Sequence, residues 1–219
     1  MGCRIILWMP QAKAVSQRRS LYSTHPSVLM TQRWFESLPE KTGKSLEQWI
    51  ALVKKSGPST EKERREWLKT KHKLGTSLAS AIAERAAGKG SEFDTPETYL
   101  EAAERYVAEM FGGSKAALRP LYDQLLQLGL QQGKDVKACP CRTMVPLYRK
   151  HVFAQIKPAT QTRIDFGFAL QDNKATGRLI DTGGYAKKDR ITHRIPITST
   201  SDIDDEVKRW LQTAYDLDA

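Results

Sequence analysis

The sequence predicts an α+β protein: an N-terminal tri-helical module, then helices packed on one face of an antiparallel β-meander, with a C-terminal helix. Apolar residues recur at helical spacing between Ser45 and Leu128. From Val136 onward the period changes to the alternation of β-strands. Hydrophobic residues make up 40% of the chain and charged residues 27%, a usual composition for a globular protein, so most of the 219 residues should fold.

The chain divides into three predicted segments. Residues 1–34 are expected to be a leader, either disordered or the product of a start-site artefact, because residues 1–29 contain no acidic residue and show no sustained periodicity. Residues 35–90 should form the tri-helical module and residues 91–219 the α+β domain. A short joint containing Gly88, Gly90 and Ser91 separates these two domains.

Two capping boxes mark the tri-helical module. Ser45 with Gln48, and Thr60 with Glu63, have the spacing in which two residues cap the same helix start. A third helix is predicted over about residues 77–87, where alanines permit close packing. The apolar residues that should form the core of this module are Leu46, Trp49, Ile50, Val53, Trp67 and Leu68.

The second domain begins with helices and continues with strands. Thr95 should cap one helix, with Pro96 in its first turn. A second helix should follow Ser114, in which Pro120 either causes a kink or marks the true first turn. A closing helix should start at Ser201 or Asp202. Strands are predicted at residues 136–139, 143–149, 152–157, 161–169 and 190–197, and a long polar surface loop at residues 171–189.

Charge is segregated along the chain. Residues 136–198 carry twelve Lys or Arg against four Asp or Glu, whereas residues 91–135 carry four against eight and residues 199–219 two against six. The whole chain has a formal net charge of +10. A basic excess favours association with polyanions such as nucleic acid, although it does not determine the fold.

The strand-rich part therefore contains a candidate site for DNA or RNA. Guanidinium groups hold phosphate oxygens and aromatic faces stack on bases, so arginine and tyrosine together suit this ligand. The alternative is that acidic residues of the flanking helices, such as Glu101, Asp204 and Glu206, neutralise these cations within the fold. The candidate residues are Arg142, Tyr148, Arg149, Lys150, Arg163, Arg178, Tyr185, Lys187, Lys188 and Arg190.

No motif in the sequence commits the chain to a reaction, a metal or a cofactor. The single residue between Cys139 and Cys141 is an awkward spacing for zinc, and no second ligand pair is present. His193 alternates in step with apolar residues and should face the apolar side of its strand. An enzyme would have to recruit His193 with Asp165, Arg163 and Tyr185, whose mutual placement their spacing does not fix.

Three cysteines are too few for a disulfide framework, which favours the reducing cytoplasm. The apolar runs are all shorter than the roughly 18 residues that a membrane span needs, so no membrane partner is expected.

Two stretches carry a resemblance to known families. The block from Lys41 to Ile50, with the later Trp67-Leu68 and Leu74-Gly75, resembles a small bacterial helical domain of unknown function. A second family, often its C-terminal partner and also of unknown function, is similar to the later part of the chain. The motifs that carry this second resemblance are Ser114 to Tyr122 (SKAALRPLY), Phe153 to Pro158, Thr162 to Gly167, Thr176 to Leu179, Trp210-Leu211 and Ala214-Tyr215.

The resemblance covers residues 35–216 and implies no catalytic residues. Relatives of the second family are sometimes attached to nuclease-like or predicted transport-associated proteins. With the charge pattern, this favours noncatalytic binding of nucleic acid or another polyanion through a basic surface of the C-terminal domain. A small-ligand-binding domain or an unrecognised enzyme is the alternative, and a protein interaction module is the second alternative.

Overall fold

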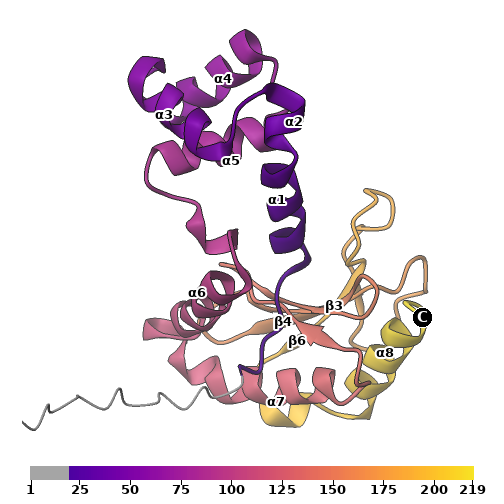
Figure 1. Cartoon of the computed structure of the whole chain (residues 1–219). Helices are drawn as coiled ribbons and strands as arrows, with labels where there is room; N and C mark the ends of the chain where they lie inside the picture. Colours follow the sequence, from indigo (N-terminus) through magenta and orange to yellow (C-terminus); the bar gives the residue numbers. More distant parts are fainter. Residues whose placement is uncertain (1–19) are drawn as a thin grey trace, which may run out of the picture.

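The structure is a computed structural model that describes residues 20–219, and it has the predicted α+β architecture (Figure 1). The prediction for residues 1–19 of the leader lies outside the described residues. The first helices in chain order are α1 (Pro26–Glu36), α2 (Leu38–Thr42), α3 (Leu46–Ser56), α4 (Glu61–His72) and α5 (Thr76–Ala86).

The three helices predicted for the N-terminal module are α3, α4 and α5. Both predicted capping boxes are present, at Ser45 and at Thr60, so local sequence determines where α3 and α4 begin. The structure adds α2, whose Leu38 is buried in the same core as Trp49 and Val53. A helix of five residues is too short to produce a recognisable period in the sequence.

Residues 20–34 differ from the leader that the sequence predicts, because this part of the chain is ordered and packs on the second domain. The side chains of Tyr22 and Val28 are buried in the core of that domain. The backbone amide of Ser23 donates to the carbonyl of Ala138 at 2.9 Å, beside the first strand. His25 caps α1 by accepting a hydrogen bond from the amide of Ser27. The hydrogen-bond partners of Tyr22 and Ser23 in the second domain are at least 100 residues away in the sequence, so local periodicity does not indicate these contacts.

The second domain contains one six-stranded antiparallel sheet in the order β1-β2-β3-β4-β6-β5. The first four strands form the predicted meander, and β5 is a short edge strand that the sequence pattern does not indicate. The strands are β1 (Lys137–Ala138), β2 (Val145–Tyr148), β3 (Val152–Pro158), β4 (Ile164–Phe168), β5 (Ile180–Asp181) and β6 (His193–Ile197).

Three longer helices complete this domain: α6 (Pro96–Met110), α7 (Arg119–Leu130) and α8 (Asp205–Asp216). In Figure 1, α7 and α8 lie on one side of the sheet, and both contact β3. Pro120 lies in the first turn of α7, which follows a 3-10 helix (Gly113–Leu118). Of the two interpretations of this proline, the first-turn position is therefore confirmed.

The two faces of the sheet differ in composition. Phe166 on β4 pairs with Ile156 on β3 and Ile195 on β6, and all three are buried in the core beneath α7 and α8. Because side chains alternate along a strand, the neighbours of these residues point the other way. We call that second side, turned away from α7 and α8, the outer face. It carries polar and charged residues.

Candidate functional site

Two rows of side chains cross the outer face. The strand register places Gln155, Gly167 and Arg194 side by side in one row. The next row contains Lys157 opposite Asp165. These residues line an open groove of about 460 Å³, which we call the sheet groove.

Cations outnumber carboxylates in the lining of the sheet groove, where Lys157, Arg190 and Arg194 lie with Asp165 and Asp189. One oxygen of Asp165 lies 3.0 Å from Nε of Arg163 and also 3.0 Å from Nη1 of Arg194. A single carboxylate therefore faces two guanidinium groups. Lys157, directly across from Asp165, is exposed and forms no ion pair within residues 20–219. Arg163, Arg194 and Lys157 together therefore carry more positive charge than Asp165 balances, and some of their N–H donors stay free at the surface.

The floor of the sheet groove requires a glycine. A Cβ atom on Gly167 would lie 2.7 Å from Cγ2 of Ile191 and 3.0 Å from Cγ of Gln155, both too close for ordinary contact. Ile191 can approach the sheet only because this position has no side chain.

A second groove of about 540 Å³ runs along the loop between β5 and β6, and we call it the loop groove. Tyr185 lines it with 57% of its surface exposed. The loop holds its own shape, because the amide of Thr182 donates to the carbonyl of Thr192 at 3.0 Å and the amide of Asp189 to that of Gly184 at 2.8 Å. Tyr185 is thus displayed on an internally hydrogen-bonded loop.

Arg190 lies where the two grooves meet, since both are lined by Asp189 and Arg190. Its Nε donates to the carbonyl of Val152 at 2.9 Å, and its Nη2 pairs with the carboxylate of Asp218. Asp218 is almost completely buried and also accepts a hydrogen bond from the amide of His151 at 2.7 Å. These contacts fix the guanidinium of Arg190 between the sheet groove and the loop groove.

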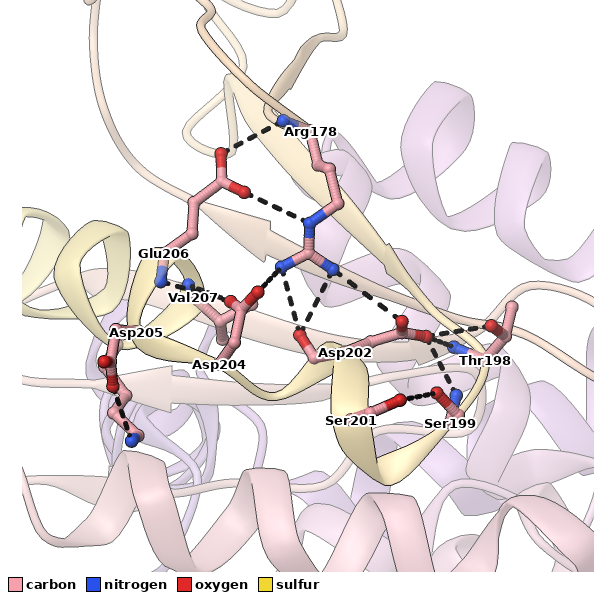
Figure 2. Close-up of polar contacts among 10 residues, drawn as sticks. Arg178, Thr198, Ser199, Ser201, Asp202, Asp204, Asp205, Glu206 and Val207 are labelled. Atoms are coloured by element: carbon pink, nitrogen blue, oxygen red, sulfur yellow. Dashed lines mark hydrogen bonds and ion pairs between the residues drawn. The ribbon is translucent and has the colours of Figure 1, made fainter.

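Arg178, one of the predicted binding residues, is instead surrounded by carboxylates at the start of α8 (Figure 2). Its Nη2 lies 2.6 Å from Asp204, its Nε 3.1 Å from Glu206, and it also donates to the backbone carbonyl of Asp202. Figure 2 shows all three partners converging on the one guanidinium. The charge of Arg178 is neutralised, and the residue fastens the loop before β5 to α8.

Arg142 and Arg149 also pair with carboxylates of this chain. Arg142 lies 2.8 Å from Glu92, and Arg149 lies 3.0 Å from Asp135.

Tyr148, another predicted binding residue, is partly buried. Burial raises the pKa of Tyr148 to about 12, and the Tyr148 hydroxyl forms a hydrogen bond with Nε2 of His25, in the segment before α1.

The structure therefore divides the ten predicted residues. It brings Tyr185, Lys188 and Arg190 to the two grooves and places Arg163 against Asp165 of the sheet groove, and Lys187 lies in the same loop as Tyr185. It separates the other five, of which Lys150 is exposed in the turn between β2 and β3. These five are Arg142, Tyr148, Arg149, Lys150 and Arg178.

Two residues of the sheet groove are absent from the predicted set, namely Lys157 and Arg194. A signal for them exists in the sequence. Alternation along each strand puts Arg194 opposite in direction to His193, and puts Lys157 opposite in direction to Ile156. Collecting the outward-pointing residues of every strand by this rule would have selected both.

The residues considered for catalysis are not assembled into one site. His193 faces the core with 1% of its surface exposed, and its Nδ1 hydrogen-bonds to the hydroxyl of Thr192 at 2.8 Å. Asp165 is on the opposite face of the sheet.

The two neighbouring cysteines are buried or partly buried thiols. Burial raises the pKa of the Cys139 thiol to about 12 and also raises the pKa of the Cys141 thiol. Among residues 20–219 no three His, Cys, Asp or Glu side chains are grouped to hold a metal ion.

The fold and the grooves together define an α+β domain with a basic, open surface on an antiparallel sheet. Residues 107–218, more than half of the chain, match the family described as Domain of unknown function (DUF5655). The chain belongs to this family. Residues 30–87 match a second family, Domain of unknown function (DUF4287), which confirms the predicted order of two uncharacterised domains. No curated protein and no solved structure matches the chain. In the described part of the chain, no helix is long and apolar enough to cross a membrane.

Proposed function

We propose that this protein binds nucleic acid, without catalysing a reaction on it, through the sheet groove of its C-terminal domain. The observation that carries the proposal is the excess of cations over carboxylates there. Arg163 and Arg194 share the carboxylate of Asp165, and Lys157 beside them forms no ion pair within residues 20–219. Asp189 is the second carboxylate that lines the groove, so three lining cations face two lining carboxylates.

Phosphate binding follows from the chemistry of these groups. Each guanidinium has five N–H donors, and the shared carboxylate occupies only some of them. The remaining donors can hold phosphate oxygens in the forked geometry that arginine favours. Lys157 would add a mobile point charge at the edge of the groove. An open groove on a sheet can follow a flexible backbone, whereas a small molecule would be poorly enclosed.

The proposal is noncatalytic because Asp165, the carboxylate between the cations of the outer face, is engaged by two guanidinium groups and has no histidine beside it within residues 20–219. The titratable His193 lies on the other face of the sheet. We further propose that the protein acts in the bacterial cytoplasm. Cys139 and Cys141 are free thiols, which suits a reducing compartment.

The test is the salt dependence of binding to a fluorescently labelled pool of oligonucleotides of mixed sequence. Binding is measured by fluorescence anisotropy for wild type and for Lys157→Ala. Lys157 is exposed and unpaired within the described chain, so its removal should leave the fold intact. We expect affinity to fall as salt rises, and the slope of log K against log salt to decrease by about 0.7 to 0.9 in the variant.

Lys54→Ala is the matched control, since Lys54 is an exposed lysine on α3, without an ion pair in the described part of the helical module. Its slope should equal that of wild type. Binding that does not change with salt, or an equal loss of slope in both variants, would remove the basis for the sheet groove. A preference for other polyanions over nucleic acid would assign the groove a different ligand.

A further inference from the structure

We infer that the nucleic acid is single-stranded, with one unpaired base stacked on Tyr185 in the loop groove while its backbone continues into the sheet groove. This inference rests on the proposed function and adds the strandedness of the ligand. It starts from the loop groove, which the binding of phosphate alone does not explain.

The loop groove has the composition of a base-binding site. Tyr185 supplies an exposed aromatic face, and Leu217 on the same groove is 42% exposed. Ala186 adds apolar surface, and Lys188 brings positive charge to the edge, where Asp189 and the Asp218-paired Arg190 also lie. An aromatic ring beside cations accepts a base on its face and a phosphate at its rim, with little dependence on base identity.

Tyr185 is also held ready for such contact. The loop that carries it is closed by hydrogen bonds from the amide of Lys188 to the carbonyl of Tyr185 at 3.0 Å and from the amide of Lys187 to that of Gly184 at 3.1 Å. Gly184 packs closely on the segment just before β6, because a Cβ atom there would lie 2.6 Å from the carbonyl oxygen of Ile191. A ring on a preformed loop loses less conformational entropy on binding than a ring on a flexible one.

The continuity of the two grooves relates base and backbone. Arg190 lines both, and its contacts to Val152 and Asp218 hold it at the junction. A strand that placed a base on Tyr185 would pass Arg190 and then reach Arg194 in the sheet groove. In a duplex the base faces are covered by neighbouring base pairs, so only a single strand can use the tyrosine and the arginines together.

The experiment compares one oligonucleotide of about 12 nucleotides, as a single strand and as a duplex, with wild type, Tyr185→Ala and Tyr185→Phe at one low salt concentration. Wild type should bind the single strand more tightly. Tyr185→Ala should weaken single-strand binding by about 5-fold to about 150-fold, the range that corresponds to the loss of one stacked base. Tyr185→Phe keeps the ring and should bind like wild type, and neither change should alter duplex binding.

The outcomes separate this inference from the proposed function. Equal or tighter binding of the duplex, or no effect of Tyr185→Ala, would overturn the single-strand inference, while a salt slope reduced by Lys157→Ala would still support the sheet groove. An equal loss in Tyr185→Phe and Tyr185→Ala would assign the contact to the hydroxyl and overturn stacking. If neither the single strand nor the duplex binds to wild type, both proposals are overturned. The exposed position of Tyr185 means that urea unfolding of all variants should coincide.

Discussion

Replacing Tyr22 with Phe tests whether the segment before α1 is a structural part of the C-terminal domain. The Tyr22 hydroxyl hydrogen-bonds to the hydroxyl of Tyr122 at 3.0 Å, and the two side chains are 7% and 0% exposed. Tyr22→Phe keeps the buried ring, so it creates no large cavity. It leaves the Tyr122 hydroxyl buried without its partner, which should lower the free energy of unfolding by about 1 to 3 kcal/mol.

Urea unfolding followed by far-UV circular dichroism measures this change. Tyr185→Phe is the control, because it removes an exposed hydroxyl and should cost less than about 0.5 kcal/mol. The double variant Tyr22→Phe with Tyr122→Phe should lose less than the sum of the two single losses, since the second change removes the unpaired group. Strict additivity, or a Tyr22→Phe loss no larger than the control, would refute the docking of this segment.

Three further changes test the core, a titration and a thiol. Phe166→Ala should lower the free energy of unfolding by about 3 to 5 kcal/mol, and Lys150→Ala, in an exposed turn, by less than about 0.5, in the same urea assay; similar losses would contradict the burial of Phe166 in the core. Burial lowers the pKa of His25, so the folded state binds fewer protons and stability should fall as pH decreases below about 6.5; His25→Phe should flatten that dependence, and an unchanged pH profile would argue against burial. Cys139 should react with iodoacetamide only after unfolding, as measured by peptide mass spectrometry, and rapid native-state labelling would contradict its burial.

Most of the fold could be predicted because its signals are local. Ser45 and Thr60 cap helices where their spacing to Gln48 and Glu63 indicates, and Thr95 does the same for α6. Long strands such as β4 show an alternation that the sequence displays directly. Three elements were missed: α1, α2 and β5. α2 and β5 contain five and two residues, which is too few for a period to be recognised. α1 has 11 residues, but only Val28 and Thr31 on it are buried, so it shows no apolar stripe.

The site was predicted less completely because ion pairs depend on residues that are distant in sequence. Arg178 meets Glu206 across 28 positions, and no spacing rule identifies that partner. The local excess of basic residues correctly placed cations in the strand-rich part, but it did not distinguish Arg178, which is neutralised, from Lys157, which is not. Only the strand register shows which cations share a face.

The most direct test of the account is to map the bound surface by NMR, titrating a single-stranded oligonucleotide into isotope-labelled protein. The account predicts chemical-shift changes at the amides of Gln155, Gly167 and Arg194 and along residues 182–190, with little change at Arg178. Changes confined to the helical module, or centred on Arg178 at the start of α8, would contradict binding through the sheet groove.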